Sequence, residues 1–403
     1  MIGSKNLSRQ FSRSAIVQAI ASAGPISRAS LAKQVGLSKQ TVSEIVSSLE
    51  QDGWIAETGR TAGHVGRTAT TYELVPDAAF VCGVDLGGTK VCAAIIDLAC
   101  TVVAELTELT DARGGTDVAR QIVRLCRQAA EGAGVNWSKV MFATVGVPGV
   151  PDQKTGSVKM APNIKKIGDF DFVGALEAEF GFGVQVENDV NLAAIGEQWS
   201  GCASEVDNMA FVSLGTGIGA GIIVGGQIVR GAMGAAGELG FLPFGADPFE
   251  PDSLKVGALE RQAGSFGMIK RYAELSGRDV QVKDLFELAL AGDADADTVL
   301  DETARLVARL IATIGAVVDP SMVVLGGSIG QRTALQKRIV AALAACFPNP
   351  IVIESSALGD HAALVGGAAV GLSHLHHTIF AAGLDNVELA LPQLSAPAWK
   401  GVR

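Results

Sequence analysis

The stretch VDLGGTKVCAAIID, residues 84–97, indicates how the larger part of this 403-residue chain folds. Two apolar runs flank a turn that contains two glycines, a threonine and a lysine. Apolar runs of this length around a glycine-containing turn are typical of a β-hairpin. Because glycine has no Cβ, the backbone N–H groups of such a turn can approach a phosphate closely. The stretch therefore predicts a hairpin whose turn can hold a phosphate.

Two more glycine-rich segments, Leu214–Gly219 and Val324–Ser328, have the same character. The first lies within Met209–Val229, an uncharged stretch that six glycines and several polar residues interrupt. We expect two buried strands around a turn there rather than a membrane span. The second should end a buried strand and open a helix. Strands that alternate with helices predict an α/β fold, and the two similar hairpin loops predict that it is duplicated.

Composition and charge point to a folded cytoplasmic protein with a separate basic head. Hydrophobic residues make up 48% of the chain and charged residues 18%, which is typical of a globular protein with a large core. We expect no signal peptide, since residues 1–10 are polar, and we expect the six cysteines, none in a C-x-x-C pair, to be reduced core thiols. Residues 1–75 carry a formal charge of +3, whereas the remainder carries −13. Only the first 75 residues would therefore attract DNA.

Residues 8–51 show the spacing of a helix-turn-helix motif. A first helix is predicted over residues 8–23, and Ser27 or Ser30 can cap a second one. Gly36 supplies the turn, and Ser38 caps a third helix, which would be the recognition helix. The predicted buried positions are Ile16, Val17, Ile20, Leu31, Ala32, Val35, Val42, Ile45, Val46 and Leu49. Two β-rich runs between residues 53 and 75 then predict a wing.

Polar side chains at the start of the third helix and along the wing are the candidate DNA contacts. Such donors can reach phosphates or base edges when a recognition helix enters the major groove, and a wing can reach the minor groove. The candidates are Ser38, Lys39, Gln40, Thr41, Ser43, His64 and Arg67. The alternative is a three-helix protein-interaction module without DNA contact. The wing and the charge contrast favour DNA binding.

Motifs along the rest of the chain occur in the order seen in the ROK family of bacterial repressors and sugar kinases. They are VDLGGTK from residue 84, VGVPG from 145, ENDVNLAAIGE from 187, VSLGTGIGAGII from 212, GAAGELG from 234 and VVDPSMVVLGGSI from 317. The chain resembles this family over nearly its whole length, and its first part resembles the repressor branch. The resemblance implies a ribonuclease-H-like, actin-type pair of lobes that closes on a sugar.

The resemblance also divides the chain into domains. Residues 1–76 would form a winged helix-turn-helix DNA-binding domain, and residues 77–380 a sensor domain that is similar to the sugar kinases. Its lobe 1 would comprise about residues 79–189 plus a C-terminal helix at about 360–378, and its lobe 2 about residues 190–359. Residues 381–403 would be a tail.

Candidate ligand-binding residues follow from the matching motifs. The resemblance implies phosphate or adenosine contacts at Asp85, Gly87, Gly88, Thr89, Lys90, Gly215, Thr216, Gly217, Gly326, Gly327 and Ser328. It implies sugar contacts at Gly149, Asn163, Asn188, Asp189, Glu238 and Glu260. Asp189 follows a predicted strand and opens a helix, whose N-terminus favours its charge. It would be the catalytic base of a kinase, whereas outside these motifs it could be a plain N-cap.

One segment departs from the family pattern. ROK proteins usually place a His and three cysteines there, which hold a structural zinc, and the His also touches the sugar. The matching positions are Phe241, Pro251, Ser253 and Ala258, none of which can bind zinc. We therefore expect no zinc. Apolar side chains should hold the loop instead, and the candidates are Phe241, Leu242, Phe244 and Phe249.

Taken together, these features predict a cytoplasmic transcriptional regulator, in the sense of a repressor, that binds operator DNA and responds to a carbohydrate. It would act as a homodimer or a dimer of dimers, because a two-fold dimer places two recognition helices about one DNA turn apart. No cofactor would be required and no membrane would be involved, although ATP and Mg²⁺ could bind the retained phosphate loops. The alternative is an ATP-dependent sugar kinase with an accessory DNA-binding domain. The altered zinc segment favours a sensor over an enzyme.

Overall fold

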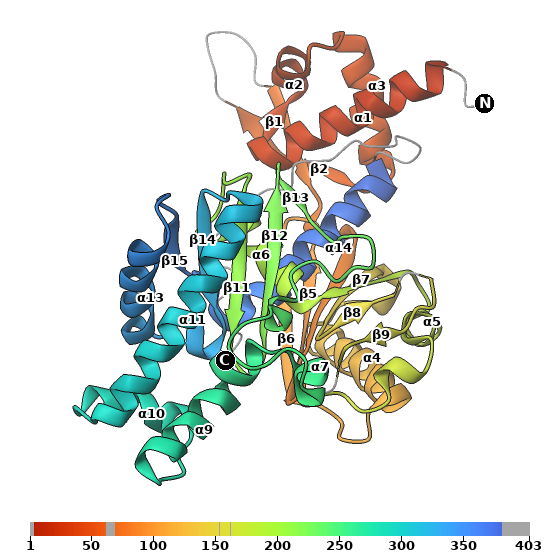
Figure 1. The fold of residues 1–403 in the computed structure, drawn as a ribbon. Coiled ribbons are helices and arrows are strands. Elements are labelled where there is room, and N and C mark those ends of the chain that lie inside the picture. The colour runs from red at the N-terminus through yellow and green to blue at the C-terminus, as the bar shows by residue number, and fades with distance from the viewer. Residues whose placement is uncertain (1–3, 62–68, 153, 162, 381–403) are drawn as a thin grey trace. The chain divides into compact units, whose positions relative to one another are not determined.

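The computed structural model describes residues 4–61, 69–152, 154–161 and 163–380. At its N-terminus, three helices and a small sheet form the head (Figure 1). The helices are α1 (Ser4–Ala23), α2 (Arg28–Val35) and α3 (Lys39–Gln51), and the strands are β1 (Ile26–Ser27), β2 (Ile55–Thr61) and β3 (Ala69–Leu74). The strand order is β1-β3-β2. The predicted helix-turn-helix and the two wing strands are confirmed.

Local sequence explains where the head helices begin and end. The Ser27 hydroxyl accepts a hydrogen bond from the backbone N–H of Ser30 at 3.2 Å, and Ser38 caps α3 in the same way through Thr41 at 3.1 Å. Gly36 ends α2 with a φ of 68°, a left-handed conformation that favours glycine. Of the predicted apolar positions, nine are buried and Val35 is half-buried. Residues 62–68, which include His64 and Arg67, lie outside the described residues.

The chain after residue 76 contains two five-stranded sheets of the same strand order, which confirms the predicted duplication. Read in the same direction, the first sheet has the order β6-β5-β4-β7-β10, and the second has the order β13-β12-β11-β14-β15. In both sheets the first strand along the chain lies in the centre. In each sheet, the first strand forms an antiparallel hairpin with the next strand and also pairs in parallel with a later one. The first hairpin joins Phe80–Leu86 to Lys90–Asp97, as its sequence predicts.

Contacts divide the chain into two units. Unit 1 comprises residues 1–147, 153–187 and 367–403, and unit 2 comprises residues 148–152 and 188–366. Beyond the head, unit 1 contains β4 (Phe80–Leu86), β5 (Lys90–Asp97), β6 (Val102–Leu109), α4 (Gly115–Gly132), β7 (Val140–Val147), β9 (Val158–Lys159), α5 (Phe172–Phe180), most of β10 (Val184–Asn188) and the second part of α14 (Ala362–Phe380). The apolar side chains of its sheet and of α4 and α5 form one buried cluster.

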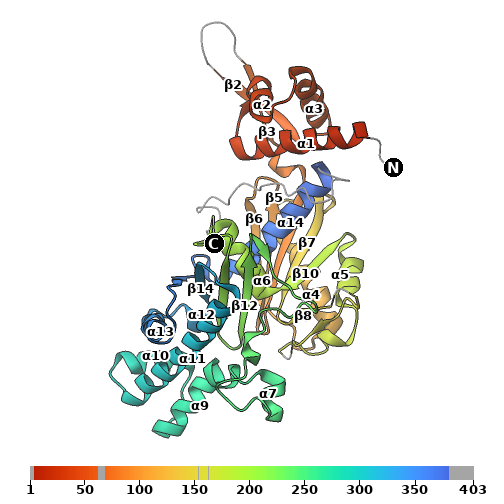
Figure 2. The same cartoon turned by 45° about the horizontal axis from the view of Figure 1, so that its top comes forward.

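Unit 2 has its own core between its sheet and the helices that cover it (Figure 2). Its strands are β8 (Val150–Pro151), β11 (Met209–Leu214), β12 (Ile218–Val224), β13 (Gln227–Ile228), β14 (Met322–Gly326) and β15 (Val352–Ser355). Its helices are α6 (Asp189–Ser200), α7 (Pro251–Val256), α8 (Glu260–Ala263), α9 (Ser265–Ser276), α10 (Val282–Leu290), α11 (Ala294–Val318), α12 (Gly327–Gly330) and α13 (Thr333–Cys346), followed by the first turn of α14.

The uncharged stretch of residues 209–229 forms β11, β12 and β13, which confirms the prediction of buried strands around a turn. No helix among the described residues is long and apolar enough to cross a bilayer. The cysteines are free thiols, of which Cys82, Cys100 and Cys126 are buried and Cys346 is exposed.

Candidate functional site

The first turn of α3 presents polar side chains at the surface of the head. Ser38, Lys39 and Gln40 are exposed, whereas Thr41 is half-buried. The Gln40 amide donates a hydrogen bond to the Glu44 carboxylate at 3.1 Å, which orders it along the helix. This turn therefore carries a cation and an amide on a helix with a fixed N-terminus, which are the groups that read phosphates and base edges.

Arg28, which the sequence pattern did not single out, holds the recognition helix in place. Its guanidinium donates to the hydroxyls of Ser43 and Ser47, both at 3.3 Å, and lies 3.6 Å from the Glu50 carboxylate. It also lies 5.0 Å from the ring centroid of Tyr72 in β3. Ser43 is thus engaged inside the head, unlike exposed Lys39 and Gln40. No sequence signal predicts these partners, because they lie on separate elements.

The candidate residues of unit 1 lie at the turn of its first hairpin. Gly87 donates a backbone hydrogen bond to the Lys90 carbonyl at 2.9 Å, which closes the turn. Thr110, which follows β6, donates its hydroxyl to the Gly87 carbonyl at 2.7 Å. Asn163 lies against the same turn, since a Cβ atom added to Gly88 would lie only 2.9 Å from the Cβ atom of Asn163. The structure therefore brings the predicted phosphate loop and Asn163 together.

In unit 2, Asn188 and Gly149 are neighbours at the start of α6. The Asn188 amide donates to the Gly149 carbonyl at 2.9 Å, and its oxygen accepts from the backbone N–H groups of Val190 and Asn191. Asn188 is therefore the N-cap, and half-buried Asp189 is the first residue of the helix. The helix N-terminus stabilises the Asp189 carboxylate. The plain N-cap role thus falls to Asn188 rather than to Asp189.

Glu238 and Glu260 lie at the same end of unit 2, around the start of β12. The Glu260 carboxylate accepts the backbone N–H of Ile218 at 2.7 Å. Ala220, two residues on, donates its backbone N–H to the carbonyl of Gly237, which precedes Glu238. Burial raises the pKa of both glutamates. For Glu260, the hydrogen bond from the Ile218 N–H lowers the pKa in part, whereas the nearby charge of Glu238 raises it further.

A ligand that donates hydroxyl hydrogens would relieve the cost of keeping these half-buried carboxylates charged. Helix α6 reaches the same strand, because a Cβ on Gly219 of β12 would lie 3.4 Å from a methyl of Val190. Strand β12 thus lies beside the first turn of α6, the Glu238 loop and Glu260. The first turn of α6, which begins at Asp189, the Glu238 loop and Glu260 accordingly lie around one strand end of unit 2.

The second phosphate loop and the predicted adenosine turn are also adjacent. Strands β11 and β14 are parallel neighbours, so the turns that follow them lie side by side. A Cβ on Gly215 would lie 3.5 Å from the Ser328 hydroxyl. Gly215 also accepts the backbone N–H of Ser265, the first residue of α9. These turns and a helix N-terminus offer the donors that a polyphosphate requires.

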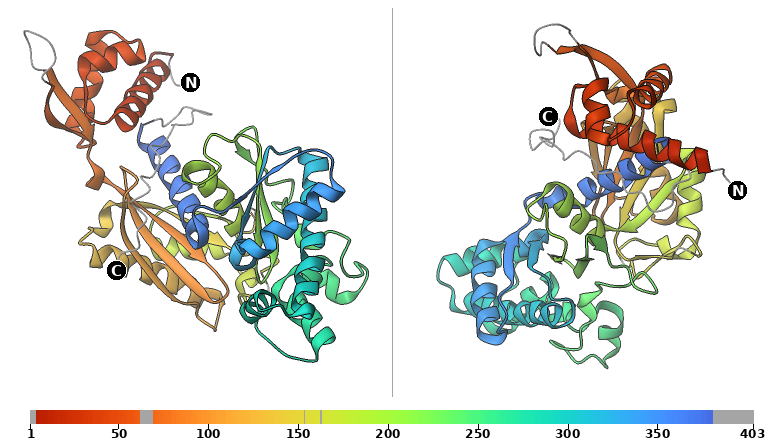
Figure 3. Two further views of the ribbon diagram at one scale, coloured as in Figure 1. Left: turned by 90° about the vertical axis from the view of Figure 1, so that its left-hand side faces the viewer. Right: turned by 90° about the horizontal axis from the view of Figure 1, so that it is seen from above.

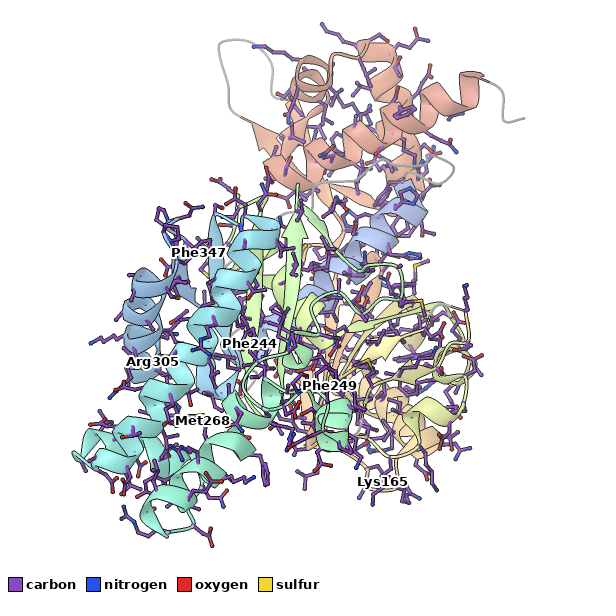
Figure 4. All side chains as sticks on the ribbon, in the orientation of Figure 1. Lys165, Phe244, Phe249, Met268, Arg305 and Phe347 are labelled. Carbon is purple, nitrogen blue, oxygen red and sulfur yellow. The ribbon has the colours of Figure 1, made fainter. Side chains whose placement is uncertain are left out.

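Two of the four predicted apolar anchors, together with polar side chains, hold the loop that departs from the family pattern. Phe249 is 90% exposed and Phe241 is 38% exposed, so neither anchors the loop, which corrects the prediction for these two residues. Figure 4 labels Phe249 and, in the same segment, Phe244. Leu242 and Phe244 do pack against the core of unit 2. A buried polar position rather than an aromatic ring occupies the centre of the loop, since Ser253 is 3% exposed.

A set of hydrogen bonds around Arg261, here called the clasp, joins residues 247–253 of this loop to the start of α8. Its guanidinium donates to Ser253 and to the Glu250 carboxylate, both at 2.6 Å. Ser253 in turn donates to the backbone carbonyl of Asp247 at 2.6 Å. The clasp ends at the residue beside Glu260 and therefore fixes the start of α8. Within the described residues, no cluster of three or more His, Cys, Asp or Glu side chains could hold a metal ion.

We expect the purified protein to contain no stoichiometric zinc and to keep its melting temperature when a chelator is added. The reason is that Ser253 and Arg261 already close the loop, so no folding free energy depends on a metal. Elemental analysis and thermal unfolding with and without EDTA measure both quantities. A content near one zinc per chain, or a lower melting temperature in EDTA, would contradict the expectation.

Glu197, inside the motif ENDVNLAAIGE, is a second residue whose role the sequence did not reveal. Its side chain is fully buried near the end of α6. One carboxylate oxygen accepts from the Ser356 hydroxyl and from the backbone N–H of Leu358 at 3.0 Å. The other accepts from the backbone N–H of Cys202 at 3.0 Å. Glu197 therefore ties α6 to the segment that leads into α14.

Sequence models of two families match this chain. The ROK family model matches residues 81–373, and a model of winged helix-turn-helix DNA-binding domains matches residues 12–56. The xylose repressor of Caldicellulosiruptor bescii is 25% identical over 93% of this chain and 98% of its own length. The transcriptional dual regulator NagC of Escherichia coli is 25% identical over 92% and 94%. A glucokinase of Halalkalibacterium halodurans is 30% identical over 71% and 92%.

Solved structures give the same picture. A ROK hexokinase from Thermus thermophilus superposes with a TM-score of 0.64 and 29% identity, and covers 73% of this chain and 99% of its own. A ROK transcriptional regulator superposes with a TM-score of 0.74 over 93% and 98%, at 21% identity, which shows the shared fold. The similarity to the hexokinase covers 73% of this chain, whereas the similarity to the regulator extends over nearly the whole chain.

Proposed function

Because this chain belongs to the ROK family, we propose that it is a transcriptional repressor that binds operator DNA and responds to a sugar. The observation that carries this proposal is that one chain combines a winged helix-turn-helix match over residues 12–56 with a ROK family match over residues 81–373. The xylose repressor relative aligns over 98% of its own length, head included. A DNA-binding regulator acts where the chromosome lies, so we place the protein in the cytoplasm.

The sugar would bind unit 2 through Asp189, Glu238 and Glu260. Carboxylates accept hydrogen bonds from sugar hydroxyls, and such charge-assisted bonds are worth about 1.5 to 3 kcal/mol each. The half-buried position of these groups strengthens such bonds, because water competes less there. Phe241, which replaces the usual His, makes the neighbourhood more apolar and would change which sugar is accepted.

A homodimer, or a dimer of dimers, would bring two heads to a nearly palindromic operator. Two-fold symmetry spaces the recognition helices by about one turn of DNA, roughly 34 to 36 Å. Sedimentation of the full chain with and without an operator duplex measures this assembly. A monomer that binds one half-site with full affinity would argue against it.

An ATP-dependent sugar kinase is the second candidate. It is favoured by the retained turn at Gly87–Lys90, by the adjacent Gly215 and Ser328 turns, and by the position of Asp189 at a helix start. The two functions separate in one assay, in which the full chain is incubated with ATP, Mg²⁺ and either D-glucose or D-xylose. We expect no sugar-dependent release of ADP, together with binding to a specific DNA duplex. Multiple turnovers without DNA binding would support the kinase.

Single substitutions in α3 test the DNA interface. Gln40→Ala is expected to relax base preference at one operator position by about 1 to 3 kcal/mol, because an amide contact to a base edge is lost. Lys39→Ala is expected to weaken binding to all sequences and to lower the slope of log K against log salt by about one, because one phosphate contact is lost.

Operator titrations at several salt concentrations measure both effects. Lys33→Ala is the matched control, since Lys33 is an exposed lysine of α2 outside the recognition helix. Equal losses for Lys33→Ala and Lys39→Ala would indicate that only the overall charge of the head matters.

A further inference from the structure

The exposed face of α3 (Lys39–Gln51) carries a carboxylate in the middle of the surface that would approach DNA. The buried face of this helix contributes Val42, Ile45, Val46 and Leu49 to the core of the head. On the opposite face, Gln40, Glu44 and Gln51 are exposed, and their spacing places them on one side of the helix. In Figure 3 the red helices of the head lie beside the orange strands β2 and β3. These three residues therefore form one outward stripe along α3.

Two arginines of the head hold serines on either side of this stripe. Arg28 of α2 donates to the hydroxyls of Ser43 and Ser47, both at 3.3 Å. Arg13 of α1 donates to the hydroxyl of Ser48 at 3.4 Å. Within the part of the chain that the structure describes, no ion pair involves the carboxylate of the stripe. The two cations thus fix α3 from its flanks and leave the charge of the stripe in place.

Glu44 and Gln40 act together, because the Gln40 amide donates to the Glu44 carboxylate at 3.1 Å. An amide nitrogen has two hydrogens, so the second hydrogen and the carbonyl oxygen of Gln40 stay available, as does the second carboxylate oxygen of Glu44. With a rise of about 1.5 Å per residue, the two Cα atoms lie about 6 Å apart along the helix axis. Base pairs are about 3.4 Å apart, so the two side chains can reach neighbouring base pairs.

A carboxylate can contact few groups on DNA. Phosphates repel it, and the only hydrogen-bond donors in the major groove are the amino groups of cytosine and adenine. Adenine also presents its N7 acceptor, which the amide of Gln40 can serve and the carboxylate of Glu44 cannot, since it has no proton. Cytosine is therefore the base that matches Glu44. Guanine or thymine in its place would set an acceptor against the charge, which penalises the wrong sequence.

We propose that Glu44 is a specificity-determining residue of the head, which accepts a hydrogen bond from the amino group of a cytosine in the operator half-site and orients Gln40 toward a neighbouring base. This inference rests on the proposed function and names a base that the head reads. Glu44 lowers the affinity for sequences without that cytosine, because its charge then has no donor. The rival role is that of a solvated surface charge, which would change only the overall charge of the head.

Base-by-base titrations of the full chain separate these roles. The probe is the duplex that the wild type selects from a random-sequence library. We expect one position at which replacement of a cytosine weakens wild-type binding by roughly 5- to 150-fold. In Glu44→Ala this difference should nearly vanish, and duplexes without the cytosine should bind as tightly as to the wild type, or more tightly. Glu57→Ala removes the same charge from an exposed position of β2, outside α3, and should keep the wild-type base profile.

Glu44→Gln gives a second, independent prediction. Glutamine keeps an acceptor for the Gln40 amide and gains a donor, so it matches adenine as well as cytosine. We therefore expect this variant to accept either base at the position where the wild type requires cytosine.

Replacement of that cytosine by N4-methylcytosine tests the contact without a change in the protein. The methyl group takes the place of the amino hydrogen that faces the major groove, whereas the pairing with guanine is kept. The wild type should bind the methylated duplex about as weakly as the duplex in which the cytosine is replaced. Glu44→Ala should bind the methylated and unmethylated duplexes alike.

A selected duplex without any cytosine whose effect depends on Glu44 would overturn the inference alone. The same holds if Glu44→Ala and Glu57→Ala raise the affinity for all sequences equally, or if the wild type ignores the methyl group. Failure of the proposed function has a different signature, because the wild type would then select no duplex at all.

Discussion

Asp189→Asn is expected to abolish the sugar response of operator binding while it leaves the sugar-free affinity for DNA unchanged. Asparagine keeps the shape of the first residue of α6 but loses the charge that the helix N-terminus stabilises. A sugar can shift the DNA-binding state only by its differential affinity for two conformations. Coupling of about 1 to 3 kcal/mol corresponds to an affinity change of roughly 5- to 150-fold, and this is the response at stake.

Glu260→Gln should have the same consequence for a separate reason. The glutamine carbonyl can still accept the Ile218 N–H, so the local structure persists, but the second charged acceptor near β12 is lost. Asp252→Asn is the matched control, because Asp252 is an exposed carboxylate of the neighbouring α7 that pairs with Lys255 at the surface. Its response to sugar should equal that of the wild type.

The measurement is an operator titration of each variant with and without sugar. The sugar is first identified by thermal shift, where a ligand at a hundred times its Kd adds about 2.7 kcal/mol of stability. If both Asp189→Asn and Glu260→Gln respond to it as the wild type does, these carboxylates do not form the effector site. The head is unaltered in all of these variants, so DNA binding provides the internal reference.

Glu197→Ala is expected to lower the free energy of unfolding by about 3 to 5 kcal/mol. The fully buried carboxylate accepts from Ser356, Leu358 and Cys202, and its removal leaves these half-buried donors without that acceptor. Each such donor costs about 1 to 3 kcal/mol, although relaxation recovers part of the sum. A cavity of side-chain size adds to the loss.

Urea unfolding followed by tryptophan fluorescence measures this loss, since Trp199 lies two residues from the substitution. Glu197→Gln retains one carbonyl oxygen and should cost less than the alanine variant. Glu287→Ala, an exposed glutamate of α10, is the control and should change stability by less than about 0.5 kcal/mol. A loss in Glu197→Ala no greater than that of the control would mean that the segment before α14 finds other partners.

The contacts of Glu197 hold α6 beside the start of α14. Glu197 joins α6 to residues 356–358, which lead through the short helical turn Gly359–His361 into α14. The two helices also approach closely at Gly366, where an added Cβ would collide with the Leu192 carbonyl.

The sequence by itself determined the elements and their order. Ser27, Gly36 and Ser38 set the ends of the head helices through contacts within four residues, and the glycine turns after residues 86 and 214 set two hairpins. Such features are readable because caps, turns and periodicity act between near neighbours. The family motifs also predicted the two related sheets and the candidate residues for binding phosphate and sugar.

Only the tertiary structure decided which distant groups meet. The sequence could not distinguish Phe249, which is exposed, from Phe380, which is buried in the core of the head. Both are aromatic, and burial depends on what the fold places opposite a side chain. Likewise, Arg28 engages Ser43, Arg261 closes the loop through Ser253, and Glu197 reaches Ser356 across 159 positions. Their partners lie on other elements, and only packing of the whole chain brings such groups within hydrogen-bond distance.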